Sequence, residues 1–289
     1  MMKRVVIVGT GLIGASVGLA LRAAAFDGAI TGVDRNAEEL STAVHAGAID
    51  EGVTPGEQAL AACCQADVVV LAVPVLAIMH WIDQLAPVLG SQTLVTDVGS
   101  TKLAICELAR RLFTGEGRAQ FLPGHPMAGK ESGGATLGDA TLFSGAVWLF
   151  TPLDEGISEA VAEWRGWVTK MGARAMDLDA ARHDRICAWV SHLPQMVSTA
   201  MAAMFEDEFA EAPEMADEFR AIGGRALREM TRLGASPYSM WRDVALTNTT
   251  PLAATLFALE QRLAHMRENL KTPELREEFQ KANEFRRER

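Results

Sequence analysis

The sequence lacks several features that mark whole classes of protein. It has no excess of basic charge, because 37 Asp and Glu residues outnumber 27 Lys and Arg residues, and the net charge is -10. Nucleic acids and anionic membranes bind clustered positive charge, so we expect neither as a partner. The longest apolar run, residues 68–79, contains Pro74 and falls far short of the roughly 20 residues that a membrane helix needs. These absences predict a soluble protein.

Cysteine is scarce as well. The chain has four, Cys63, Cys64, Cys106 and Cys187, with neither the spacing of metal ligands nor the density of a disulfide scaffold. A reducing compartment suits them, and we expect a cytoplasmic protein without a metal site. The N-terminal segment imitates a secretory signal peptide, but its glycine spacing and the strand that follows it favour a place in the folded domain.

The length and the strand pattern predict how the chain is organised. A chain of 289 residues, 49% of them hydrophobic, is long enough for two domains. Through residue 178, short β-branched runs alternate with helical stretches, which is typical of a parallel sheet with helices on both faces. We therefore predict an α/β, Rossmann-type dinucleotide-binding domain over residues 1–178. Its predicted strands are residues 4–8, 30–34, 68–73, 93–97, 120–122, 147–150 and 174–177.

The second half of the chain has helical rather than strand periodicity, and we predict an all-α domain over residues 179–289. Helices are expected over residues 184–205, 216–233 and 239–269, with Pro251 breaking or kinking the last, and over the charged tail from residue 273. The helix 184–205 has a broad apolar face that needs a surface to pack against. Pairing of this domain between two subunits would bury that face, so we expect a homodimer.

A glycine motif lies between the first predicted strand and a predicted helix. Gly9, Gly11 and Gly14, with Leu12 and Ile13 between them, have the G-x-G-x-x-G spacing in the context that dinucleotide binding requires. Gly9 would permit a tight turn, Gly11 a close approach of the pyrophosphate, and Gly14 close packing of the helix on the strand. The helix N-terminus would face the phosphate charge. The alternative is a plain glycine-rich turn.

Residues at the ends of the next strands extend this site. Asp34 ends the second strand, where a carboxylate can accept hydrogen bonds from the adenosine ribose and repel a 2′-phosphate, so we predict NAD rather than NADP. Arg35 would favour NADP if Asp34 turned away. Val73 and Pro74 follow the strand 68–73 at the carboxyl edge of the sheet, where ligands of open α/β folds bind, and we assign them to the cofactor site.

Two polar residues are candidates for the chemistry. Ser100 follows the strand 93–97, and it could cap the next helix or present its hydroxyl to a ligand. His125 lies between Gly124 and Pro126 on a predicted loop, where core packing explains it poorly. Since imidazole has a pKa of about 6.5, His125 could take a proton from a substrate hydroxyl while hydride leaves the same carbon.

Several segments, taken in order, resemble the TyrA-type prephenate and arogenate (cyclohexadienyl) dehydrogenases over nearly the whole chain. They are GTGLIGAS from Gly9, DVGSTK from Asp97, GHPMAGKESGG from Gly124, SHLPQ from Ser191 and MTRLGASPYSMWRD from Met230. The family's fold, a nucleotide-binding domain followed by a helical dimerisation domain, agrees with the organisation predicted above. The resemblance implies an NAD-dependent enzyme of tyrosine biosynthesis. It would decarboxylate prephenate oxidatively to 4-hydroxyphenylpyruvate, arogenate to tyrosine, or both.

The resemblance also implies roles for single residues. His125 matches the family's catalytic histidine, Ser100 a serine that orients the reacting hydroxyl, and Arg232 an arginine that binds a substrate carboxylate. Glu131 matches an acidic residue near the entrance of the site. In the implied reaction hydride passes to the nicotinamide, His125 takes the proton and the ring carboxylate leaves as carbon dioxide, without a metal.

Two positions in the helical half leave alternatives open. His192 is either a buried structural histidine or part of the substrate site. Gln195 stands where many relatives have a histidine that is associated with side-chain recognition and tyrosine feedback. Because glutamine stays neutral, we expect arogenate to be accepted at least alongside prephenate. We also expect weak inhibition by tyrosine, because the sequence shows no fused regulatory module.

Two rival interpretations compete with this family. A β-hydroxyacid dehydrogenase also joins a nucleotide domain to helices, but its catalytic lysine has no clear equivalent after residue 179. A non-catalytic NAD-sensing Rossmann protein would not need His125, Ser100 and Arg232 together. His183, beside Asp184, is interpreted as a helix-start residue.

Overall fold

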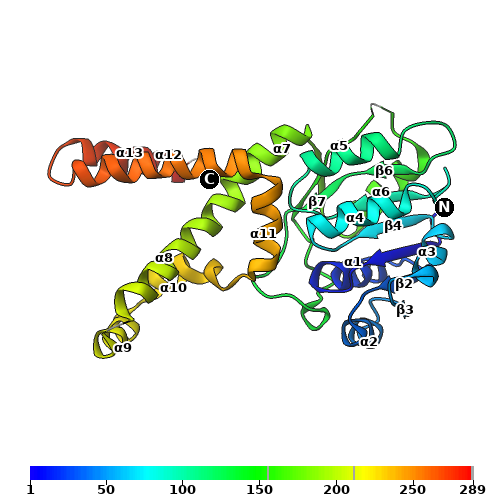
Figure 1. Cartoon of the computed structure of the whole chain (residues 1–289), viewed down its shortest axis with the longest axis horizontal. Helices are drawn as coiled ribbons and strands as arrows, with labels where there is room; N and C mark the ends of the chain where they lie inside the picture. The colour runs from blue at the N-terminus through cyan, green and yellow to red at the C-terminus, as the bar shows by residue number, and fades with distance from the viewer. Residues whose placement is uncertain (155, 211, 288–289) are drawn as a thin grey trace.

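The structure, a computed structural model, describes residues 1–154, 156–210 and 212–287. Figure 1 shows an α/β domain built from the N-terminal part of the chain and a helical part that extends away from it as two diverging arms. The predicted fold class, a Rossmann-type domain followed by an all-α domain, is confirmed.

Within the described residues, six parallel strands form the main sheet, in the order β3-β2-β1-β4-β5-β6. The strand order reverses between β1 and β4, which is the switch point where open α/β sheets bind ligands. The loop after β1 therefore lies at the expected crevice. The strands are β1 (Arg4–Val8), β2 (Ala29–Val33), β3 (Glu51–Val53), β4 (Val68–Leu71), β5 (Leu94–Asp97) and β6 (Gln120–Leu122).

Helices cover both faces of this sheet because its buried strands are apolar on both sides. In β1, Val5 and Ile7 pack in the cluster that includes α1, whereas Val6 and Val8 pack in the opposite cluster with α4 and α5. The helices of this domain are α1 (Leu12–Ala23), α2 (Ala37–His45), α3 (Glu57–Cys64), α4 (Val75–Leu85), α5 (Leu103–Leu112) and α6 (Glu159–Lys170).

A separate small sheet corrects the expectation of one parallel sheet up to residue 178. In the part of the chain that the structure describes, β7 (Gly124–Pro126) pairs antiparallel with β8 (Val147–Phe150), which pairs parallel with β9 (Arg174–Asp177). His125 therefore lies on a strand, although its sequence predicts a loop. Neither β7 nor β3 was predicted, because each is three residues long, contains glycine and becomes a strand only through its partner.

The helical half begins with a break in a helix that was predicted to be continuous. α7 (Ala180–Cys187) passes through a π-helical turn (Ala188–His192) into α8 (Leu193–Phe209). Pro194 explains the break, because proline has no N–H for the α-helical ladder and its ring clashes with the carbonyl four residues earlier. The remaining elements are α9 (Pro213–Ile222), α10 (Arg225–Thr231), a 3-10 turn (Arg232–Ala235), α11 (Tyr238–Thr247), α12 (Thr249–Glu268) and α13 (Glu274–Arg287).

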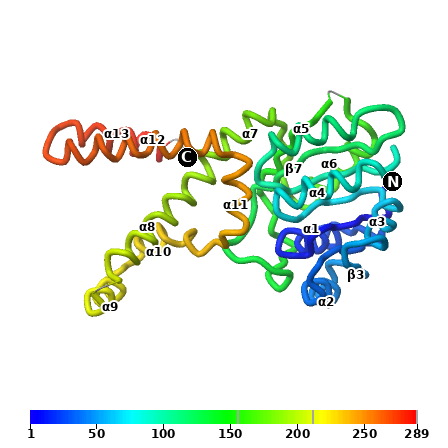
Figure 2. Tube along the Cα trace, viewed as in Figure 1, coloured from blue at the N-terminus to red at the C-terminus, as the bar shows by residue number. Residues whose placement is uncertain are grey.

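These helices leave much apolar surface uncovered in the single chain. One arm contains α8, α9 and α10, and the other contains α12 and α13 (Figure 2). Trp189 and Val190 are each 50% exposed, and other large apolar side chains of the helical part are similarly open to solvent: Met204, Ile222, Leu246, Phe257, Leu263, Leu270 and Phe279. Among the described residues, no helix is both long and apolar enough to cross a membrane.

Candidate active site

The glycine loop joins β1 to α1 at the switch point of the sheet. Gly9 has a φ of 90°, a conformation that favours glycine, and its N–H donates to the carbonyl of Val33. A Cβ on Gly14 would lie 1.8 Å from the carbonyl oxygen of Gly9, so α1 could not pack this closely with a side chain there. A Cβ on Gly11 would meet nothing within 4 Å. The outer glycines are thus required by the fold, and the backbone at Gly11 is open to a ligand.

Asp34 lies beside this loop, half-buried at the end of β2. Its carboxylate accepts hydrogen bonds from the backbone N–H of Thr10 at 2.8 Å and of Asn36 at 2.9 Å, which holds it close to the glycine turn. Arg35 is exposed and has no ion pair among the described residues. Val73 borders the same turn, because its Cγ1 would lie 2.6 Å from a Cβ on Gly9.

The remaining residues of the predicted cofactor site lie next to these. Leu12 and Ile13 form the first turn of α1, with Leu12 buried and Ile13 half-buried. Pro74 is exposed and precedes α4. The structure therefore brings the predicted cofactor residues to one edge of the sheet, and their roles stay predictions.

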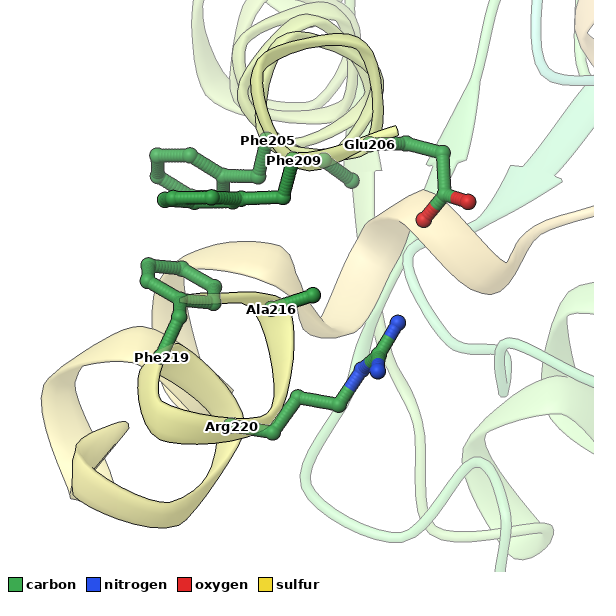
Figure 3. Close-up of a pocket in the computed structure, with 7 residues that line it drawn as sticks. Phe205, Glu206, Phe209, Ala216, Phe219 and Arg220 are labelled. Carbon is green, nitrogen blue, oxygen red and sulfur yellow. The ribbon is translucent and has the colours of Figure 1, made fainter. Parts of the chain in front are cut away.

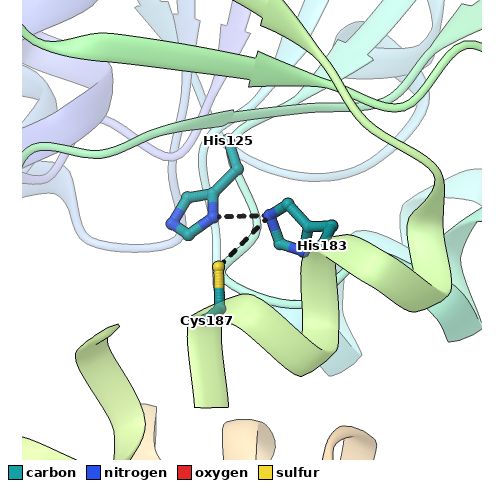
Figure 4. Close-up of side chains that lie close together, drawn as sticks. All are labelled: His125, His183 and Cys187. Carbon is teal, nitrogen blue, oxygen red and sulfur yellow. Dashed lines mark hydrogen bonds between the residues drawn. The ribbon is translucent and has the colours of Figure 1, made fainter. Parts of the chain in front are cut away.

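His125 lies in a chain of hydrogen bonds that crosses from one domain to the other. Its Nδ1 is 2.9 Å from Nε2 of His183 on α7, and Nδ1 of His183 is 2.8 Å from a carboxylate oxygen of Asp184 (Figure 4). All three side chains are buried, and His125 is 8% exposed. His183 is therefore more than the helix-start residue that its sequence suggested, and it lies in direct contact with the candidate base.

The chain of bonds defines which nitrogen of His125 can act. A carboxylate accepts hydrogen bonds, so Nδ1 of His183 donates to Asp184 and Nε2 of His183 accepts from Nδ1 of His125. This assignment of tautomers leaves the lone pair of His125 on Nε2. That atom has no hydrogen-bond partner among the described residues, and it is available to accept a proton.

The surroundings keep this pair of histidines neutral. Burial, followed by the positive charges that His183, Lys102 and His192 would carry, holds the pKa of His125 well below its usual range. Burial also lowers the pKa of His183, although the hydrogen bond from its ring to Asp184 acts in the opposite direction. A neutral imidazole is the form that a general base requires.

Asp184 also fastens α7 to the other domain. Its two carboxylate oxygens accept hydrogen bonds from the backbone N–H groups of Lys102 at 2.7 Å and Leu103 at 2.9 Å, at the start of α5. The capping interpretation of Ser100 is therefore wrong, because α5 begins at Leu103 and the carboxylate of Asp184 takes the place of a capping side chain. The hydroxyl of Ser100 is half-buried and has no hydrogen-bond partner among the described residues.

A buried ion pair shapes the turn that carries Ser100. The ammonium of Lys102 and the carboxylate of Asp97 pair with no solvent exposure. The same carboxylate accepts from the backbone N–H of Gly99 at 2.8 Å and of Gly124 at 3.1 Å, so it joins the end of β5 to the strand that carries His125. The sequence analysis missed this pair, although Asp97 and Lys102 are the first and last residues of DVGSTK.

His192 is buried beside this network. Asn248 donates to its Nδ1 at 3.1 Å and to the carbonyl of Asp184 at 2.9 Å. The hydrogen of His192 is therefore on Nε2, which is buried and has no partner among the described residues. Burial lowers the pKa of His192 to about 4, so the ring is neutral. A buried N–H without an acceptor favours the site-lining alternative, because a bound ligand could satisfy it.

Gln195 is occupied by the fold. Its Nε2 donates to the carbonyl of Leu233 at 2.7 Å and to Thr199 at 3.1 Å, and its Oε1 accepts from Ser236 at 3.2 Å. These bonds hold the 3-10 turn that carries Arg232 against α8. Gln195 therefore supports the position of this turn, and its contact with a substrate stays a prediction.

Arg232 and Glu131 form an ion pair across the domains, between the 3-10 turn and the loop after β7. The side chain of Arg232 is 59% exposed, so its guanidinium is open to solvent as well as to Glu131. The structure thus brings these two predicted residues together.

A hollow near the tip of one arm contains none of the predicted residues. Figure 3 shows aromatic rings from α8 and α9 facing each other, with Glu206 and Arg220 on one side. It is lined by Ala202, Phe205, Glu206, Phe209, Ala216, Phe219 and Arg220.

A dinucleotide-type glycine loop on a Rossmann sheet, joined through a buried histidine pair to a helical domain, defines a nucleotide-binding protein of two domains. Two family descriptions match it: the prephenate dehydrogenase nucleotide-binding domain over residues 17–177, and the prephenate dehydrogenase dimerization domain over residues 179–284. The chain belongs to the prephenate dehydrogenase family, which confirms the resemblance found in the sequence and excludes the β-hydroxyacid dehydrogenase alternative.

Individual relatives agree with this assignment. A prephenate dehydrogenase of Lactococcus lactis is 34% identical over 248 residues, which are 86% of this chain and 65% of that protein. The chain therefore spans slightly less than two thirds of that relative's length. It also spans 65% of the length of a Bacillus subtilis prephenate dehydrogenase. The solved Aquifex aeolicus prephenate dehydrogenase, in complex with hydroxyphenyl propionate and NAD+, is 29% identical with a TM-score of 0.84, covering 100% of this chain and 96% of that one. Synechocystis arogenate dehydrogenase is 29% identical with a TM-score of 0.77 and 99% of each chain covered.

The geometry of the glycine loop predicts different effects for two alanine substitutions. Gly14→Ala places a methyl group against the Gly9 carbonyl and should destabilise the fold by about 1–3 kcal/mol. Gly11→Ala has room and an ordinary backbone conformation, so it should leave stability nearly unchanged but weaken NAD binding. Urea unfolding and calorimetric NAD titration measure the two effects. Unchanged NAD affinity in Gly11→Ala would contradict the prediction that the pyrophosphate binds against this loop.

Proposed function

We propose that this protein is an NAD-dependent dehydrogenase of tyrosine biosynthesis that oxidatively decarboxylates prephenate to 4-hydroxyphenylpyruvate, arogenate to tyrosine, or both. The observation that carries the proposal is His125, neutral and buried, with its Nε2 lone pair free and its Nδ1 bonded to His183. Family membership and the relatives named for prephenate and arogenate supply the substrate class.

His125 acts in this proposal as the proton acceptor. Its Nε2 takes the proton of the ring hydroxyl while hydride leaves the carbon that bears this hydroxyl. The resulting cation is stabilised through His183 by the negative charge of Asp184, in the way a carboxylate supports the histidine of a catalytic triad. NAD, when bound, supplies the acceptor for the hydride. Loss of the ring carboxylate as carbon dioxide then makes the ring aromatic.

Other residues would hold the substrate. Arg232 is suited to a carboxylate because its planar guanidinium forms two parallel hydrogen bonds, and a substrate carboxylate would replace Glu131 as its partner. The free hydroxyl of Ser100 and the unpartnered Nε2–H of His192 are further donors for oxygen atoms of the substrate. Gln195 would tune side-chain selectivity through the turn that carries Arg232, and we propose that arogenate is accepted with prephenate and that tyrosine inhibits weakly.

The cofactor would be NAD because of Asp34. The residues fit the dinucleotide, since the backbone at Gly11 is open and the Asp34 carboxylate is held beside the loop by Thr10. This carboxylate can accept ribose hydroxyl groups, and its charge opposes a 2′-phosphate.

We further propose a cytoplasmic homodimer, with the domains divided between residues 178 and 179. The match to a dimerization domain and the exposed apolar side chains of α8 and α12 support pairing through the helical part. The four cysteines are free, which suits a reducing compartment.

An assay of cofactor reduction tests the function. The protein is incubated with prephenate or with arogenate, each with NAD or NADP, and absorbance of the reduced cofactor is followed. NAD should be reduced with at least one substrate, and with a higher kcat/KM than NADP. Failure of both substrates with both cofactors would contradict the proposed activity. A preference for NADP would indicate that Arg35, rather than Asp34, determines the choice of cofactor.

His125→Asn should lower kcat by about 10²–10⁴-fold while NAD binding is retained, because only the proton acceptor is lost. His80→Asn, on the exposed surface of α4, is the matched control and should keep wild-type activity.

The lowered pKa of His125 also predicts a pH profile. The base is active when neutral, so kcat/KM should fall only as the pH drops below the ordinary imidazole value of about 6.5. A midpoint above that value would contradict the assignment.

Arg232→Gln should raise KM for the substrate by roughly 10–100-fold, which corresponds to a charged hydrogen bond of about 1.5–3 kcal/mol, and should leave KM for NAD unchanged. Arg228→Gln, one turn earlier on α10 and exposed, is the control. Steady-state kinetics with each reactant varied separate the two constants. Equal increases in both would indicate a structural arginine.

Sedimentation equilibrium should give a mass of two chains of 31.1 kDa each, because a single chain leaves the apolar faces of α8 and α12 in water. A monomer at micromolar concentration would refute pairing through this domain.

A further inference from the structure

A group of potential metal ligands surrounds the Nδ1 atom of His125. His183 and Cys187 lie four residues apart on α7 and so face the same side, and their side chains point toward His125 on β7 (Figure 4). The Cys187 sulfur is 3.6 Å from Nε2 of His183, which is 2.9 Å from Nδ1 of His125. The three candidate ligand atoms all lie within 4.8 Å of one another.

Two of these distances are close to those of a tetrahedral zinc site. With bonds of about 2.0–2.1 Å to nitrogen and about 2.3 Å to sulfur, neighbouring ligand atoms lie roughly 3.3–3.6 Å apart. The separations of 2.9 and 3.6 Å therefore need only small side-chain movements. Three protein ligands leave a fourth position for water.

The second layer around the cluster is also suited to a metal. A histidine that binds zinc usually donates its other N–H to a carboxylate, which orients the ring. Nδ1 of His183 already has this bond to Asp184, and the backbone of Lys102 and Leu103 holds the carboxylate in place. His183 and Cys187 have no solvent exposure, so the ligands are preorganised on packed elements.

Charge at the cluster can be balanced. Burial raises the pKa of the Cys187 thiol to about 12, so the thiol is protonated until a cation displaces its proton to solvent. The thiolate and the Asp184 carboxylate would then offset the two charges of the cation. The ammonium of Lys102 is already paired with Asp97.

We propose that His125, His183 and Cys187 form an inhibitory site for Zn²⁺ and similar thiophilic divalent cations. The cation takes the lone pair of His125 at Nδ1, so the hydrogen of this nitrogen moves to Nε2. His125 then carries an N–H where it needs a lone pair and cannot accept the substrate proton. Inhibition rests on the function proposed above, whereas binding of the metal does not.

Titration of the metal-free protein with Zn²⁺ and Co²⁺ tests the site. Calorimetry should find one high-affinity ion per chain, and Co²⁺ should produce a cobalt–thiolate charge-transfer absorption. Cys187→Ala should abolish this absorption and weaken Zn²⁺ binding by at least roughly 10–100-fold. Loss of a residue that only orients a metal ligand already costs this much, and Cys187 is itself a ligand. Cys63→Ala, an equally buried cysteine on α3, is the matched control and should bind as the wild type does.

Activity provides the second measurement. After treatment with a chelator, wild type and both variants should have similar activity, and Zn²⁺ should inhibit wild type and Cys63→Ala at concentrations that leave Cys187→Ala active. Absence of the thiolate absorption in the wild type, or equal Zn²⁺ affinity in Cys187→Ala, would overturn the site even if that variant folds poorly. Binding without inhibition would overturn the inhibitory role. If the chelated wild type reduces no NAD, the proposed function fails and the cobalt spectrum still decides the site.

Discussion

The Asp184 carboxylate joins the two domains and orients the histidine pair at the same time. The N-terminus of a helix has unpaired N–H groups and a partial positive charge, so a carboxylate there contributes about 0.5–2 kcal/mol. Asp184 makes this contact with α5, and Asp243 from the same helical domain makes a similar one with Leu76 at the start of α4. Because Asp184 also accepts from His183, the position of the helical domain and the orientation of His125 depend on one group.

Burial has two consequences at this site. It removes water from His125 and His183, which lowers the pKa of both rings and leaves them as neutral hydrogen-bonding groups. Burial also keeps the thiol of Cys187 protonated, and this thiol lies beside the ring of His183. A neutral imidazole can bind either a proton or a metal ion, so the same arrangement underlies both roles that we propose for His125, as a base and as a metal ligand. The two uses exclude each other because the tautomer of one ring decides both.

The sequence predicted well where the signal is local. β1, β6, β8 and β9 have their predicted bounds, and β1 is the clearest case because Arg-Val-Val-Ile-Val is a β-branched run that ends at a glycine. α11 and α12 are separated at Asn248, three residues before Pro251, because proline fits the first turn of a helix but not its interior. The strand under His125 was missed, since Gly-His-Pro has no strand propensity and pairs only because β8 lies beside it. Its place between glycine and proline and the family resemblance both made His125 a candidate, but neither indicated the partner that orients it.

The sequence alone therefore determined the dinucleotide loop, the α/β character of the first domain and the family. These features depend on residues close together in the chain, where spacing carries the physical constraint directly. Only the tertiary structure decided what surrounds His125, because His183, Asp184 and Cys187 are distant from it in sequence and meet it when α7 docks on α5. It also decided that Ser100 leaves its hydroxyl free, since the carboxylate that caps α5 comes from the other domain.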